Sequence, residues 1–179
     1  LILLVVLVPI LNILASSFSS ATAVSSGKVG VLPVNFSLEG YEAVFNNSLI
    51  MGGFLNSLLY MVLGTIINLA LALTAAYALS HKDLVGRRFF TFLFAFTMLF
   101  SGGMIPTYLV VRGLGLVDTM WAMVLPGALS VYNMIIARTF MQSSIPEVLY
   151  DAAAIDGCSY ARRFFLITLP LSKALIAVL

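Results

Sequence analysis

Three long stretches without a charged side chain constrain this chain more than any other feature. Residues 43–80, 89–111 and 119–137 contain no Asp, Glu, Lys or Arg. A helix that crosses the bilayer core needs about 20 predominantly apolar residues, and each stretch offers that length. Charged residues make up only 9% of the chain and mean hydropathy is +1.10, whereas soluble domains average about 25% charged residues. The sequence therefore predicts an all-α, polytopic membrane helical bundle.

The apolar runs also set the expected boundaries of a single transmembrane domain. We expect whole spans at about 54–79, 89–111 and 119–141, partial spans at 1–14 and 169–179, an external segment at 15–53 and a cytoplasmic loop at 143–168. The chain begins at Leu1 rather than Met and stops at Leu179 inside an apolar run. We therefore expect a fragment that is truncated at both ends.

The first apolar run has two interpretations. It is followed by "ASSFSSATA", which is typical of a signal peptide with an Ala-x-Ala cleavage site at Ala21 and Ala23. The alternative is a first span that is retained in the mature protein, and this is the interpretation that we favour.

Composition and motifs exclude several functional classes. The net charge is +2 and no basic stripe is interleaved with aromatic residues, so nucleic acid is not an expected partner. Cys158 and His81 are single residues of their kind, which excludes a disulfide framework and a Cys- or His-based metal site. The sequence "GKVG" at residue 27 is not the G-x-x-x-x-G-K-[ST] phosphate loop. We expect this chain to bind no cofactor of its own.

The distribution of Lys and Arg predicts the orientation in the membrane. Basic residues on one side of the expected spans are Lys82, Arg87, Arg88, Arg138, Arg162, Arg163 and Lys173. The opposite side has Lys28 and Arg112. The positive-inside rule then places the segments around residues 81–88 and 143–168 in the cytoplasm, and residues 15–53 outside.

The stretch "SSIPEVLYDAAAIDGCSYARRFFLITLP" predicts a short cytoplasmic helix between two spans. Ser144 and Glu147 have the spacing of a capping box, and Gly157 is a suitable helix stop. Ser159 or Tyr160 starts a second short helix, and Pro170 opens the next span. Three consecutive alanines favour helix and leave little side-chain bulk, so another protein's backbone can approach closely.

The same stretch resembles the EAA loop of bacterial ABC importer permeases. Asp151-Ala152-Ala153 is followed by Gly157 after three residues, by Ile167 after nine more, and then by Leu169-Pro170 after one. The family pattern has Glu where this chain has Asp151, and the carboxylate, one methylene shorter, weakens or re-aims the expected contact with the partner. The segments "VLPVNFSLEGY" and "AAYALS", and the long run from "SGGMIPTYLV" to "DAAAIDG", resemble the sugar-importer branch related to the maltose permease and, more closely, oligosaccharide permeases of Gram-positive bacteria.

This resemblance implies a fold, a mechanism and a set of partners. It implies a type I ABC importer permease of about six spans in a bacterial cell membrane, with its EAA helix docked on a cytoplasmic ATPase subunit that binds ATP and Mg²⁺. It also implies a second homologous permease subunit, an extracellular or periplasmic solute-binding protein and a sugar substrate. The permease itself is not an enzyme. The residues that the resemblance assigns to the coupling loop are Asp151, Ala152, Ala153 and Gly157, with Ile167, Leu169 and Pro170 completing the motif. Glu147 and Asp156 are secondary candidates beside it.

Polar residues within the expected spans are candidates for a sugar pathway. Amide side chains and aromatic faces suit carbohydrate, and the candidates are Tyr132, Asn133, Asn56, Asn68 and Tyr108. Hydrogen bonds between packed helices explain the same residues equally well. The spans contain no carboxylate, which argues against an ion-coupled transporter.

Two further questions stay open at the level of sequence. The "SGG" at residues 101–103, with Pro106 close behind it, indicates either a break in its span or close helix packing by small residues. A membrane enzyme is disfavoured because the acidic residues all lie in expected loops. A helical scaffold or a channel-like protein remains the alternative to a transporter.

Overall fold

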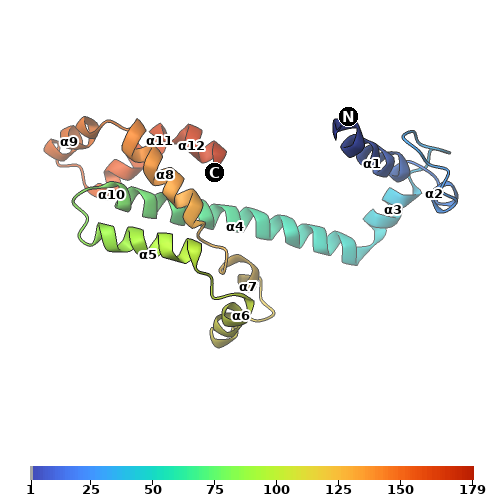
Figure 1. The fold of residues 1–179 in the computed structure, drawn as a ribbon, viewed down its shortest axis with the longest axis horizontal. Helices are drawn as coiled ribbons and strands as arrows, with labels where there is room; N and C mark the ends of the chain where they lie inside the picture. The colour runs from blue at the N-terminus through green and yellow to red at the C-terminus, as the bar shows by residue number, and fades with distance from the viewer. Residues whose placement is uncertain (1) are drawn as a thin grey trace. The chain divides into compact units, whose positions relative to one another are not determined.

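The structure is a computed structural model that describes residues 2–179, and in this range it is helical (Figure 1). One isolated bridge, between Ser19 and Phe36, is the extent of β-pairing among these residues. The elements in chain order are α1 (Ile2–Ser17), α2 (Ala21–Ser25), α3 (Glu39–Asn46), α4 (Ser48–Ser80), α5 (Arg87–Leu99), α6 (Met104–Gly113), α7 (Trp121–Val124), α8 (Val131–Ser144), α9 (Glu147–Ile155), α10 (Tyr160–Arg163), the π-helical turn η1 (Phe164–Thr168), α11 (Leu169–Leu171) and α12 (Lys173–Val178). The all-α prediction is confirmed.

The chain forms two compact units that divide after Leu59 within α4. In the first unit, the segment after α1 folds back onto the end of that helix. The Asn12 amide donates to the carbonyls of Val29 and Gly30 at 2.9 and 2.8 Å, and the Tyr41 hydroxyl donates to the Ser17 hydroxyl at 2.9 Å. These side-chain bonds join α1 to residues of the segment 15–53, which the sequence predicts to be external.

The alanines of the alternative signal-peptide site lie in α2 in this unit. The Ser20 hydroxyl caps α2 by accepting from the Ala23 amide, and Ala23 is buried. Neither observation tests cleavage, and the retained first span stays a prediction.

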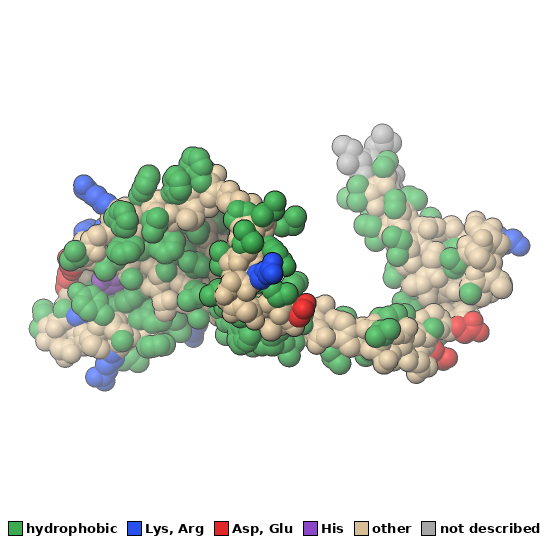
Figure 2. Space-filling view, turned by 90° about the horizontal axis from the view of Figure 1, so that it is seen from below, with side chains coloured by type: hydrophobic (Ala, Val, Ile, Leu, Met, Phe, Trp, Pro, Cys, Tyr) green, Lys and Arg blue, Asp and Glu red, His purple; other side chains and the backbone are tan. Residues whose placement is uncertain are grey.

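The core of the second unit lies where α4 packs against α8. Ala72 and Ala76 of α4 and Ala137 of α8 are fully buried, and small side chains allow two helix backbones to approach closely. Larger residues complete this core around them: Leu73, Tyr77, Leu79, Met134, Met141, Ile145, Phe164 and Leu175. Figure 2 shows hydrophobic side chains over much of the visible surface of this unit, with its charged side chains in small separate groups.

The expected span at 89–111 is two helices rather than one. α5 and α6 are bent by 118° at the break between them. Gly103 has a φ of +86°, a backbone conformation that other residues rarely adopt. Of the two interpretations of the "SGG" segment, the structure therefore shows the broken helix.

The expected span at 119–141 is also interrupted. α7 ends at Val124, and α8 begins at Val131 with the Ser130 hydroxyl accepting from the Asn133 amide. Pro126 and Gly127 lie in the turn between the two helices. Proline lacks the amide hydrogen that a helix interior requires, so the continuous helix expected from hydropathy is wrong here.

Helix length separates α4 from the other elements. It has 33 residues, or about 50 Å at 1.5 Å per residue. Within the described residues, α4 is the one helix that is long and apolar enough to cross a membrane by itself, and α5 with α6 would be a second if the bent pair counts as one span.

Candidate coupling site

Helix α9, which carries the predicted coupling residues, follows two extended residues that separate it from α8. Ile145 and Pro146 both have extended backbones, because proline disfavours the helical conformation in the residue before it. Ser144 is therefore the last residue of α8 rather than the cap of α9, and Pro146 precedes α9 without a side-chain cap. The predicted capping box of Ser144 and Glu147 is wrong for this reason.

The C-terminal end of α9 follows the prediction. The Cys158 amide donates to the Ala153 carbonyl at 2.9 Å, and the Gly157 amide donates to the Ala154 carbonyl at 3.0 Å. This pair of bonds is the Schellman motif, which requires a left-handed residue at its centre, and Gly157 has a φ of +72°. The Ser159 hydroxyl then caps α10 by accepting from the Arg162 amide. The predicted helix stop and the second short helix are both confirmed.

One side of α9 is open to its surroundings. Ile155 and Val148 are 88% and 72% exposed, and Asp151 and Ala152 are exposed between them. At 100° per residue these four side chains share one helix face. We call Val148, Asp151, Ala152 and Ile155 the docking face.

The other predicted coupling residues have different surroundings. Glu147, Asp156 and Gly157 are exposed and Ala153 is half-buried. Ile167 lies in η1, and Leu169 packs against the core. Pro170 lies in the first turn of α11, where its missing amide hydrogen costs little. α11 nevertheless continues directly from η1 with helical dihedrals, so Pro170 does not mark a fresh start of helix.

Tyr150 lies on the opposite side of α9 and joins this helix to η1. Its hydroxyl is 2.9 Å from the hydroxyl of Thr168, which is fully buried. Burial raises the pKa of Tyr150 above its ordinary value, and the hydrogen bond with Thr168 acts in the opposite direction. The phenol is therefore held in its neutral form.

The last turn of α4 and the residue that follows it supply two aromatic rings, Tyr77 and His81, to the same region. The His81 ring centroid lies 4.4 Å from that of Tyr77, 5.1 Å from that of Tyr150 and 5.6 Å from that of Tyr160. Tyr77 is also 5.1 Å from Phe164, and its hydroxyl donates to the Tyr160 carbonyl at 3.0 Å. We call Tyr77, His81, Tyr150, Tyr160 and Phe164 the aromatic cluster.

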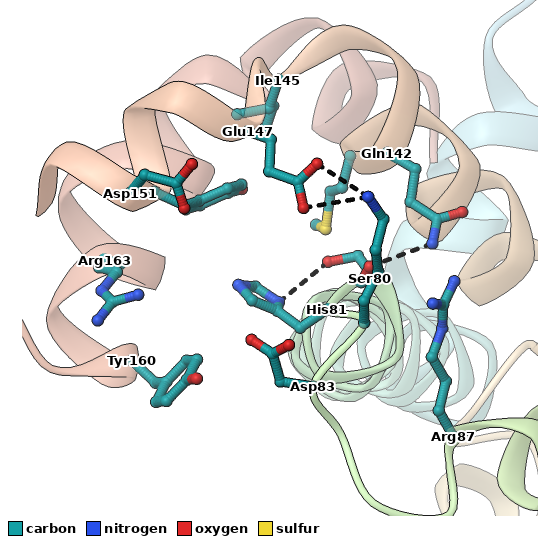
Figure 3. Close-up of a pocket in the computed structure, with 13 residues that line it drawn as sticks. Ser80, His81, Asp83, Arg87, Gln142, Ile145, Glu147, Asp151, Tyr160 and Arg163 are labelled. Carbon is teal, nitrogen blue, oxygen red and sulfur yellow. Dashed lines mark hydrogen bonds and ion pairs between the residues drawn. The ribbon is translucent and has the colours of Figure 1, made fainter. Parts of the chain in front are cut away.

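A pocket of about 410 Å³ opens beside this cluster (Figure 3). Its rim carries an ion pair between Lys82 and Glu147 at 2.9 Å, whose side chains are 71% and 67% exposed. An exposed pair of this kind contributes at most about 1 kcal/mol. His81, Asp151 and Arg163 point toward the same hollow in Figure 3. The pocket beside α9 is thus lined by both carboxylate and cationic side chains.

The carbonyl groups at the end of α4 receive side-chain donors from other elements. Arg87 and Arg138 both donate from Nε to the Leu79 carbonyl, at 3.0 and 3.1 Å, and the Gln142 amide donates to the Ser80 carbonyl at 3.1 Å. The last four carbonyls of a helix lack partners within it, and cations are favourable at this end. These bonds join the C-terminal end of α4 to the start of α5 and to α8.

The predicted sugar-pathway residues do not form one site in the structure. Tyr132 and Asn133 lie together in the first turn of α8, with Tyr132 61% exposed. Asn56 and Asn68 are both on α4 but about 18 Å apart along its axis. Tyr108 on α6 lines a separate hollow near Asp118. Their role in transport stays a prediction.

Sequence reasoning missed the part of the site that faces inward. From the sequence, His81 counted only as a lone histidine, Lys82 only as one of the basic residues that predict the orientation, and Tyr160 only as a possible start of the second short helix. Tyr150 had no expected role. One signal was available for Tyr150, because helical periodicity places it opposite Asp151 and Ile155. Its contact with His81 joins positions far apart in the chain, which no local pattern reveals.

The chain resembles known transport proteins over nearly its whole length. It is 44% identical over 176 residues to the polygalacturonan/rhamnogalacturonan transport system permease protein YtcP of Bacillus subtilis (strain 168), covering 98% of this chain and 61% of that protein. It is 41% identical over 173 residues to Protein LplC of the same organism, covering 97% of this chain and 58% of that protein. No protein-family model matches the chain.

A solved structure has the same fold. A chain in the crystal structure of a bacterial ABC transporter involved in the import of the acidic polysaccharide alginate matches with a TM-score of 0.93 and 35% sequence identity. The match covers 99% of this chain and 63% of that chain. The chain thus spans less than two thirds of the length of each of these relatives.

The helical fold and these similarities point to one class of protein, the membrane permeases. Within that class, the chain is similar over nearly its whole length to permease subunits of ABC transporters, and the relatives named here include a polygalacturonan/rhamnogalacturonan permease and a chain of an alginate importer. The family resemblance carried by residues 151–170 is confirmed at the level of the family.

Proposed function

We propose that this chain forms part of the membrane pathway of an ATP-driven importer that brings a sugar or oligosaccharide into the cytoplasm. The relatives named above support the transport of a saccharide: one is a polygalacturonan/rhamnogalacturonan permease, and another belongs to an importer of the acidic polysaccharide alginate. ATP and Mg²⁺ bind to a separate ATPase in this proposal, and the chain itself catalyses no reaction. Its other partners are a second permease subunit and a solute-binding protein that delivers the sugar from outside.

The docking face of α9 is the observation that carries this proposal. Val148 and Ile155 expose large apolar side chains beside Asp151, and a short helix of this kind fits a groove on a partner protein as an amphipathic ligand. The Schellman motif at Gly157 and the Tyr150 bond to Thr168 hold α9 against the membrane helices. A partner that pulls on α9 therefore pulls on those helices too.

The proposed orientation places α9 in the cytoplasm and the segment from residue 15 to residue 53 outside, in a multi-pass arrangement. The basic residues Lys82, Arg87, Arg162 and Arg163, which lie on either side of α9 in the chain, support this orientation through the positive-inside rule. Cys158 is the single cysteine of these 179 residues and reports on sidedness. A membrane-impermeant maleimide should label it in inside-out vesicles and leave it unlabelled in intact cells.

The decisive experiment is co-purification in detergent. The full-length protein is expressed with its candidate partner permease and ATPase, as wild type and as Ile155→Asp. A matched control is Leu32→Asp, because Leu32 is also strongly exposed, at 76%, but lies on the proposed external side. We expect the ATPase to purify with wild type and control and to be lost from Ile155→Asp. If no ATPase associates with correctly inserted wild-type protein, the helical scaffold or channel-like protein becomes the better interpretation.

A further inference from the structure

The inward side of α9 contacts α4 through aromatic rings rather than through the exposed ion pair. Tyr150 is the side chain of α9 that enters the aromatic cluster, with the His81 ring 5.1 Å away. At the rim, Lys82 in the turn after α4 pairs with Glu147, the first residue of α9, but both side chains lie largely in solvent. Solvent and salt screen such a pair, whereas packing between the half-buried rings of His81 and Tyr150 is less sensitive to both. The ring contacts therefore connect α9 to the end of α4 more strongly than the ion pair does.

The orientation of the His81 ring is fixed from within α4. Its Nδ1 lies 2.9 Å from the Tyr77 carbonyl, and since a carbonyl oxygen only accepts, Nδ1 carries the proton and donates. The ring then lies between Tyr150 of α9 and Tyr160 of α10. The side chain of His81, the residue that directly follows α4, thus contacts the helices on both sides of the Gly157 stop.

Tyr77, one turn earlier on α4, holds the same two segments. Its ring packs on Phe164, and its hydroxyl donates to the Tyr160 carbonyl at 3.0 Å. The ring is also 6.3 Å from that of Tyr150, and the residue is buried. A shift of α9 and α10 relative to α4 would separate these rings and break the hydrogen bond. These contacts persist only if α4, α9 and α10 move together.

We propose that His81 and Tyr77 are positioning residues that make α4 follow the movement of α9. This inference rests on the proposed function, in which an ATPase moves α9. His81 carries the link between α9 and α10 through its ring contacts, and Tyr77 fixes both the His81 ring and the backbone of α10. Neither residue lies on the docking face, so ATPase binding and the transmission of its movement are separable.

The test follows the movement of α4 directly and needs no sugar. In a Cys158→Ser background, a reporter cysteine replaces Gly64 of α4, where an added Cβ has no neighbour within 4 Å. The complete complex in lipid nanodiscs is treated with a maleimide, with and without ATP and vanadate, and the ratio of the two labelling rates is the readout. Bound ATPase and ATP hydrolysis are measured in the same samples.

Three variants at His81 separate the ring from the hydrogen bond. His81→Ala removes both, His81→Phe keeps a ring, and His81→Asn keeps a donor for the Tyr77 carbonyl without a ring. We expect the ATP-dependent labelling ratio to fall to near one in the Ala and Asn variants, with ATPase still bound, and to be largely restored by Phe. The loss corresponds to an about tenfold weaker coupling, as expected for two aromatic contacts.

Each other outcome has a definite meaning. An unchanged ratio in His81→Ala, or a Phe variant as defective as Ala, overturns the role of the ring. If His81→Ala no longer assembles with the ATPase, Tyr77→Phe, which loses only a hydroxyl, is measured instead, and an unchanged ratio there overturns the proposal. If wild type binds no ATPase at all, the proposed function fails first, and this result is distinguishable from the others.

Discussion

The hydroxyl groups of Tyr150 and Thr168 lie 2.9 Å apart and join the inward side of α9 to the π-helical turn η1. Thr168 is fully buried, and Tyr150 reaches it from the helix that carries the docking face. This one contact connects residues 18 positions apart across the Gly157 stop. It fixes how far α9 can tilt away from the segment that follows it.

Removing one partner of this hydrogen bond should destabilise the protein more than removing both. Tyr150→Phe leaves a buried Thr168 hydroxyl without its partner, and we expect a cost of about 1–3 kcal/mol. Combining it with Thr168→Val should recover part of that loss, because no polar group is then left unpaired. Thermal unfolding in detergent measures all three variants, and strictly additive losses would contradict the assignment.

Alkaline pH should destabilise the fold at Tyr150, because burial disfavours the ionised phenol. The folded-state pKa of Tyr150 is raised by burial, so its stabilising contribution is complete below the unfolded value of about 10 and is lost as pH rises through the folded value. The stability advantage of wild type over Tyr150→Phe should therefore be constant at lower pH and shrink as pH rises above about 10. Unfolding curves of the two proteins at matched pH test this, and a constant or growing difference would show that the tyrosine is not protected by burial.

Substitutions at Gly157 should act through backbone conformation alone. An added Cβ meets nothing within 4 Å, but φ is +72°, and a left-handed backbone costs other residues about 1–2 kcal/mol. We expect losses in the order Asn, Ala, Val, since Asn tolerates this conformation best and β-branched residues worst. Gly157→Val should also weaken ATPase association while membrane insertion stays normal.

A suitable control is Gly40→Ala, within α3. Its Cβ also has open space and its φ is not positive, so stability should be unchanged or slightly raised. Unfolding and ATPase co-purification are measured for the whole series. Normal ATPase association in Gly157→Val would refute our account of this residue.

Arg87 and Arg138 should substitute for one another at the end of α4. Both donate to the Leu79 carbonyl, so either Arg→Met change alone leaves that acceptor with a partner. We expect each single change to cost about 0.5–1.5 kcal/mol and the double change to cost more than their sum. Gln142→Leu, which affects the neighbouring Ser80 carbonyl, should be additive with either. Additive losses for the two arginines would mean that they act independently.

The sequence alone determined the features that depend on neighbours along the chain. The length of the uncharged runs predicted an all-α membrane protein, because a bilayer-crossing backbone must satisfy its own hydrogen bonds. The end of α9 was predictable because glycine reaches a left-handed φ at no steric cost, and the motif at residues 151–170 was sufficient to indicate the family. The break in the helix at Pro126 and Gly127 also follows from the local sequence. It was not predicted because the whole run from residue 119 to residue 137 is uncharged and apolar.

The tertiary structure alone decided the features that depend on distant contacts. Ser144 satisfied a capping pattern, yet Ile145 is buried in the core and Pro146 holds it extended, so Ser144 ends α8 instead. The "SGG" segment had two equal interpretations until the bend between α5 and α6 was seen. His81 met Tyr150 and Tyr160 only through the packing of three helices. Local propensity does not specify which side chains meet across a core, because that depends on the shape of every packed neighbour at once.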